Sequence, residues 1–106
     1  MATNKLVGLL GMCRASGRLT AGFDAVAALC RESSVLLMVA DDAAERTVRQ
    51  LTFAAGDIPV YRIPLTRDEV ANAIGSHKPV AVLATTDIGF MRALRPLLTI
   101  VQEEES

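Results

Sequence analysis

The sequence has few of the residues that catalytic and metal sites need. Of its 106 residues, His77 is the only histidine, and Cys13 and Cys30 are the only cysteines. No CxxC pair or other metal-ligand spacing is present. A Ser-His-Asp triad has little support without a GxSxG sequence, and no Gly-Lys-Ser/Thr follows the early glycines as a phosphate-binding loop requires. We therefore expect no catalysis, no metal and no cofactor.

Long apolar runs and aromatic residues are also scarce. The clearest apolar runs, residues 35–40 and 80–84, are far too short to cross a membrane. No basic and apolar leader opens the chain, which predicts a cytoplasmic protein whose two cysteines are buried, reduced thiols. The aromatic residues are three phenylalanines and one tyrosine, and they do not form the interleaved pattern typical of base-stacking surfaces.

The charge is nearly balanced, with eleven basic and twelve acidic residues and a formal net charge of −1. This is not the strongly basic balance typical of a nucleic-acid binder. Three of the acids, Glu103, Glu104 and Glu105, lie in the last four residues, so the rest has eleven basic and nine acidic residues and can carry a local basic face. We assign residues 1–98 to a single domain and residues 99–106 to an acidic C-terminal tail.

Helical and extended patterns alternate along the chain. Residues 4–16 have apolar side chains at helical spacing, and Thr20 is predicted to cap a second helix. Residues 35–40 form a continuous apolar run, typical of a strand covered on both faces. Residues 59–63 and 80–84 are predicted as two more strands. Strands separated by helices predict an α/β fold, a three-layer α/β/α sandwich with a small central mixed sheet.

Three further helices have recognisable start signals. Asp42 with Glu45, and Thr66 with Glu69, match the capping-box pattern, in which a side chain at the helix start and one three residues later each bind the other's backbone N–H. Asp87 is predicted to cap the last helix. A cation site at the Asp41-Asp42 pair is the less favoured alternative to the helix cap.

Several phrases, in this order and spacing, resemble one family. They are KLVGLLG at residues 5–11, RASGRL at 14–19, the apolar strand followed by DDA at 41–43, PVY at 59–61, AIG at 73–75 and TDIGF at 86–90. Over residues 4–98 the chain resembles the kink-turn-binding ribosomal protein superfamily of archaeal and eukaryotic large subunits, within it the small bacterial YlxQ-type branch. The resemblance implies a non-catalytic ribonucleoprotein component that binds structured, ribosomal or kink-turn-like RNA in translation. It also implies ribosomal or translation proteins as further partners, and neither DNA nor a membrane.

The superfamily's RNA-binding motif is altered in this sequence. The motif is Gly-x-Asn-Glu with a lysine three residues after the glutamate, and the matching positions are Ala21, Gly22, Phe23, Asp24 and Ala27. In the family the asparagine and glutamate hydrogen-bond guanine edges, which are read through donors and acceptors. Phe23 stands in place of the asparagine and can stack but cannot form these bonds. Asp24, in place of the glutamate, is a shorter acceptor, and Ala27, in place of the lysine, carries no charge.

The resemblance and the local chemistry together give a set of candidate RNA-binding residues. The start of the second helix is expected to bind phosphate, flanked by the two arginines before it, and a lysine lies where the family places a second RNA-facing loop. The candidates are Arg14, Arg18, Thr20, Ala21, Gly22, Phe23, Asp24 and Lys78. Two alternatives stay open: the charges are ordinary solvated ones, and Phe23 contacts the core or a partner protein. The second hypothesis is therefore a protein-interaction module of this fold that has lost kink-turn recognition.

Overall fold

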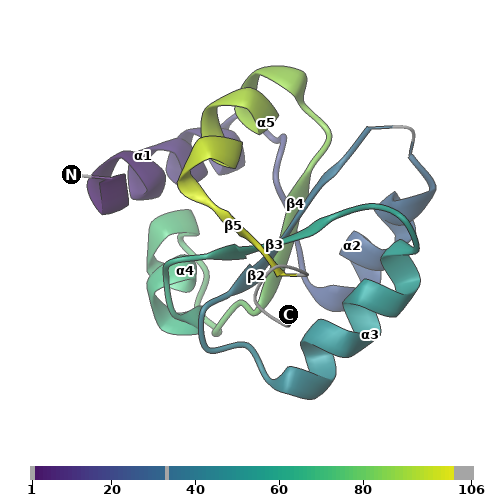
Figure 1. The fold of residues 1–106 in the computed structure, drawn as a ribbon. Helices are drawn as coiled ribbons and strands as arrows, with labels where there is room; N and C mark the ends of the chain where they lie inside the picture. Colours follow the sequence, from purple (N-terminus) through teal and green to yellow (C-terminus); the bar gives the residue numbers. More distant parts are fainter. Residues whose placement is uncertain (1, 33, 102–106) are drawn as a thin grey trace.

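A mixed sheet of five strands runs through the part of the chain that the computed structural model describes, residues 2–32 and 34–101 (Figure 1). The strand order is β1-β4-β2-β3-β5; β2 and β3 are parallel, and the other neighbouring pairs are antiparallel. In chain order the elements are α1 (Ala2–Ala15), β1 (Thr20–Ala21), α2 (Phe23–Ala28), η1 (Leu29–Arg31), β2 (Leu36–Ala40), α3 (Glu45–Ala55), β3 (Val60–Ile63), α4 (Arg67–Ile74), β4 (Val82–Thr85), α5 (Ile88–Leu94), η2 (Arg95–Leu97) and β5 (Thr99–Ile100).

The central strand β2 is buried on both faces. Leu36, Met38 and Ala40 belong to a core cluster with residues of α1, α4 and α5. Leu37 and Val39 belong to a second cluster with residues of α2 and α3. Side chains alternate across a strand, so its continuous apolar sequence supplies both cores. Figure 1 shows these two groups of helices on opposite sides of the sheet, which confirms the predicted three-layer sandwich with a mixed sheet.

Two of the predicted helix caps are present. In α4 the Glu69 amide donates to Thr66 Oγ1 at 3.2 Å, and the Thr66 amide donates to Glu69 Oε1 at 2.9 Å, so the capping box is complete. At α5 the Phe90 amide donates to Asp87 Oδ2 at 2.9 Å. Each cap satisfies amides that have no partner inside the helix.

The predicted capping box at Asp42 and Glu45 is wrong. Helix α3 begins after Ala44, which makes no side-chain cap. The Asp42 carboxylate instead accepts a hydrogen bond from the Arg67 amide at 2.8 Å, at the start of α4. The Asp42 carboxylate, which the local pattern assigned to the cap of α3, therefore binds an amide at the start of α4 instead.

Thr20 does not cap α2, contrary to the prediction. It lies in β1 and pairs with Ala84 of β4, which keeps it extended. Helix α2 begins at Phe23, directly after Gly22, which has φ 101° and ψ 144°. Such a conformation is essentially restricted to glycine, so Gly22 allows the chain to leave the sheet and enter the helix.

The boundary predicted after residue 98 needs correction. Thr99 and Ile100 form β5, which pairs with Arg62 and Tyr61 of β3, and Val101 is buried in the second core cluster. The fold therefore continues to at least residue 101. The acidic residues at 103–105 lie outside the described residues.

Within residues 2–32 and 34–101, no helix is long and apolar enough to span a membrane. The same residues contain no group of three or more histidine, cysteine or carboxylate side chains placed to hold a metal ion. Cys13 and Cys30 are both free thiols, the first buried and the second half-buried.

Candidate nucleic-acid interface

The chain brings the starts of α2, β4 and α4 together at one edge of the sheet. The Gly22 amide donates to the Val82 carbonyl at 2.9 Å, and the Val80 amide donates to the Arg67 carbonyl at 3.2 Å. The end of β2 lies at this edge too, because Asp42 accepts from the Arg67 amide. We call this edge the α2–β4 edge; it comprises residues 22–24, 76–82, 41–42 and 65–67.

The motif-matching residues lie at the α2–β4 edge with different exposures. Gly22 and Asp24 are exposed. Thr20 and Ala21 are half-buried in β1. Phe23 is half-buried and packs against the core cluster beneath α2 and α3. The Asp24 carboxylate is thus available to a ligand, whereas Phe23 has part of its surface committed to the core.

Lys78 lies, as predicted, in the loop that leads from α4 into β4. Its side chain is exposed and forms no ion pair with any residue in the described ranges. The loop is braced by Ser76, whose hydroxyl donates to the Lys78 carbonyl at 2.9 Å and accepts from the Lys78 amide at 3.2 Å. The loop runs into β4 at Val82, whose carbonyl accepts from the Gly22 amide, so the exposed Lys78 ammonium lies four residues along the chain from the contact with the start of α2.

Two arginines at this edge were not among the predicted site residues. Arg67 Nε lies 3.5 Å from Asp42 Oδ1, with both side chains almost half exposed. The Arg62 guanidinium donates to the carbonyls of Ala40 and Asp41 at 3.3 and 3.1 Å. Both follow from topology: β2 and β3 are parallel, so their carboxyl ends and the residues after them meet at one edge.

Arg14 and Arg18 do not flank the start of α2, which corrects the predicted grouping. In the antiparallel β1–β4 pair, Gly22 lies beside the start of β4, whereas Arg18 lies beside its end. Residues 19–21 lie between them, and the four residue-to-residue steps span about 13 Å in an extended chain. Arg14 is exposed in the last turn of α1, before the turn that leads to Arg18.

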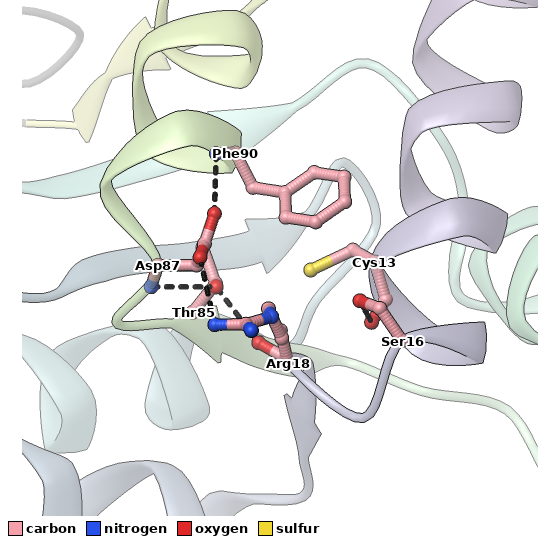
Figure 2. A network of polar contacts seen from close by, with 6 residues as sticks. All are labelled: Cys13, Ser16, Arg18, Thr85, Asp87 and Phe90. Atoms are coloured by element: carbon pink, nitrogen blue, oxygen red, sulfur yellow. Dashed lines mark hydrogen bonds and ion pairs between the residues drawn. The ribbon is translucent and has the colours of Figure 1, made fainter.

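Arg18 belongs instead to a polar network between the turn after α1 and the turn after β4 (Figure 2). Its NH1 atom lies 3.0 Å from Asp87 Oδ1, and its carbonyl accepts from the buried Thr85 hydroxyl at 2.7 Å. That hydroxyl also accepts from the Asp87 amide at 3.1 Å. The other oxygen, Asp87 Oδ2, accepts from the Phe90 amide. The Asp87 carboxylate therefore links the two turns and caps α5.

Removing the Asp87 side chain tests this network. We expect Asp87→Ala to lower the free energy of unfolding by about 1 kcal/mol or somewhat more, because α5 loses its cap and Arg18 loses its partner. Asp87→Asn keeps a capping oxygen and should lose only the charge, so its effect should be smaller. Urea unfolding of both variants measures the difference; equal losses would contradict the capping role.

Cys13 is buried beside this network, and we expect its thiol to make the stability of the fold sensitive to alkaline pH. Burial raises the pKa of the Cys13 thiol, the Asp87 carboxylate raises it further, and Thr85 and Arg18 oppose the shift. The thiol pKa is higher in the native state than in the unfolded chain, where it is about 8.5, so this difference stabilises the native state fully below about pH 8.5. The contribution is lost as the pH rises through the native pKa. We expect Cys13→Ala to reduce the fall in unfolding free energy between pH 8 and 10. An unchanged pH profile would exclude this contribution.

No protein-family model and no curated protein matches the chain, but solved structures do. A protein of unknown function from Bacillus halodurans is 30% identical, with a TM-score of 0.75 over 87% of this chain and 94% of that one. The chain belongs to the same family as that protein. The 15.5 kDa RNA-binding protein of Giardia lamblia is 16% identical, with a TM-score of 0.72 over 91% of this chain and 83% of that one. The chain therefore shares its fold with an RNA-binding protein.

Proposed function

We propose that this protein is a non-catalytic RNA-binding protein that recognises structured RNA at the α2–β4 edge. The finer assignment, a kink-turn-like or ribosomal RNA in a cytoplasmic translation complex, follows from the resemblance of residues 4–98 to the kink-turn-binding superfamily. The fold shared with the Giardia lamblia RNA-binding protein supports RNA binding in general.

One observation carries the proposal: Gly22–Asp24 and the Lys78 loop, far apart in the sequence, meet at the same exposed edge. A free ammonium group contributes phosphate attraction, and the exposed Asp24 carboxylate can accept hydrogen bonds from base amino groups. Phe23 offers no donor or acceptor where the superfamily motif has asparagine. We therefore infer that this protein does not read the RNA by the superfamily's usual pair of base-edge contacts.

Titration with RNA tests the proposal. A kink-turn RNA and a structured RNA without a kink are titrated at 50 and 200 mM salt by electrophoretic mobility and calorimetry. We expect binding that weakens as the salt concentration rises, because phosphate contacts release counterions. Preference for the kink-turn RNA supports the finer assignment. Absence of binding to both RNAs at 50 mM salt would overturn the proposal.

The competing function, a protein-interaction module, is separated by capture from a cell extract. The tagged full-length chain is used with and without ribonuclease treatment. Partners lost after ribonuclease are bridged by RNA, as we expect. A partner that survives the treatment, together with failure in the titration, would establish the protein-interaction function instead.

A further inference from the structure

An open hollow of about 570 Å³ lies between the start of α2 and the outer face of α3. It is lined by Phe23, Asp24, Arg49, Gln50, Phe53 and Ala54. Its most unusual feature is Phe53, whose exposed fraction is 90%. A phenyl ring left in water forgoes the burial that stabilises aromatic side chains elsewhere, so the fold itself does not explain this residue.

The polar side chains around the hollow match the parts of a nucleotide. Arg49 approaches Glu45 only to 4.0 Å, with both side chains largely exposed, so its guanidinium is available to a phosphate group. Gln50 supplies an amide that can donate and accept, and Asp24 supplies an acceptor. Phe23 forms a fixed wall, because it packs against the second core cluster.

The surroundings of Phe53 fit a base better than a protein surface. Among the described residues, the other exposed large apolar side chains are Val7, Met12 and Ile88, which belong to α1 and α5 on the opposite side of the sheet (Figure 1). Phe53 is thus a mostly exposed ring that lies across the hollow from the half-buried Phe23, and charges of both signs border the two rings, whereas a protein-docking site presents a wider apolar patch without charges inside it. Single-stranded bases stack on exposed aromatic rings of this kind.

We propose that this hollow holds one unpaired nucleobase of the bound RNA, stacked on Phe53, with Arg49 on the adjoining phosphate. The inference rests on the proposed RNA-binding function and extends its interface from the α2–β4 edge. The two surfaces are continuous through Phe23 and Asp24, which belong to both. A nucleotide that unstacks from RNA bound at the edge therefore finds an aromatic face and a cation beside it.

The test uses a kink-turn RNA with 2-aminopurine at an unpaired position and a matched RNA with the label at a paired position. Stacking on Phe53 should quench the unpaired label and leave the paired label unchanged. Phe53→Leu keeps an apolar side chain without a ring; it should remove the quenching and weaken binding about fivefold or more. Phe53→Tyr should recover both, and Met12→Ala, an exposed position on α1, should bind like the wild type.

The outcomes separate this inference from the function on which it rests. If the wild type binds RNA and Phe53→Leu matches it in quenching and affinity, the base-stacking inference is overturned while RNA binding stands. If the wild type binds neither RNA, the proposed function fails, and the inference fails with it. If Phe53→Leu leaves RNA binding intact but abolishes a ribonuclease-resistant complex, the hollow is a protein site and the inference is wrong. Thermal unfolding checks that every variant is folded.

Discussion

Met38→Ala is expected to lower the free energy of unfolding by about 2–5 kcal/mol, the usual cost of truncating a buried methionine. Met38 is completely buried on the central strand, where its neighbours Leu83 and Tyr61 belong to β4 and β3. Its side chain packs in the cluster formed with α1, α4 and α5, so a cavity there affects three helices at once. A small domain has about 5–15 kcal/mol of stability, so this variant should be close to its threshold.

Met12→Ala provides a matched control for this prediction, because it removes the same side chain from an exposed position. Met12 is 56% exposed on α1, and its loss should change stability by less than about 0.5 kcal/mol. Urea unfolding of the two variants measures the contrast. Equal losses in the two variants would contradict the assignment of β2 as the strand buried on both faces.

Lys78→Glu is expected to weaken RNA binding about tenfold or more at low salt, since it replaces a phosphate-attracting charge with a repelling one. Lys78 is exposed and has no ion-pair partner among the residues that the structure describes, so its charge is available to a ligand. Lys78→Ala should also reduce the slope of log affinity against log salt by about 1. Titrations from 50 to 200 mM salt measure both effects.

Lys5→Glu is the control for charge alone. It makes the same change at the only other lysine, which is exposed near the start of α1 on the other side of the sheet from α2. Its effect should be limited to the small, long-range influence of net charge. If Lys5→Glu weakens binding as much as Lys78→Glu, the α2–β4 edge is not the binding surface.

Local patterns were sufficient for the fold wherever the deciding contact was local. The apolar run of β2 predicted a strand buried on both faces, and the Thr66–Glu69 capping box is formed by residues three apart. The same pattern at Asp42 and Glu45 failed because the Asp42 acceptor binds the start of α4, 25 residues away. Strand β5 was missed because a two-residue strand has no periodicity and exists only through its pairing with β3.

In the candidate site, too, residues were predictable from the sequence, whereas their grouping depends on long-range strand pairing. The motif positions and the Lys78 loop came from a family resemblance, and their meeting at one edge is set by strand pairing. Arg18 was grouped with Gly22 because the two are close in sequence, but the antiparallel β1–β4 pair places them at opposite ends. Phe53 was not predicted as a site residue, although helical spacing from the inward-facing Leu51 and Ala55 places it on the outer face of α3.

The central claim is that RNA binds at the α2–β4 edge and the adjoining hollow, and nuclear magnetic resonance of the ¹⁵N-labelled chain tests it most directly. Amide shifts are followed while a kink-turn RNA is added at low salt. We predict shifts concentrated in residues 20–24, 49–54 and 76–82, with the amides of α1 and the turn at Arg18 nearly unchanged. Shifts centred on α1 and Arg18, or none at saturating RNA, would contradict the claim.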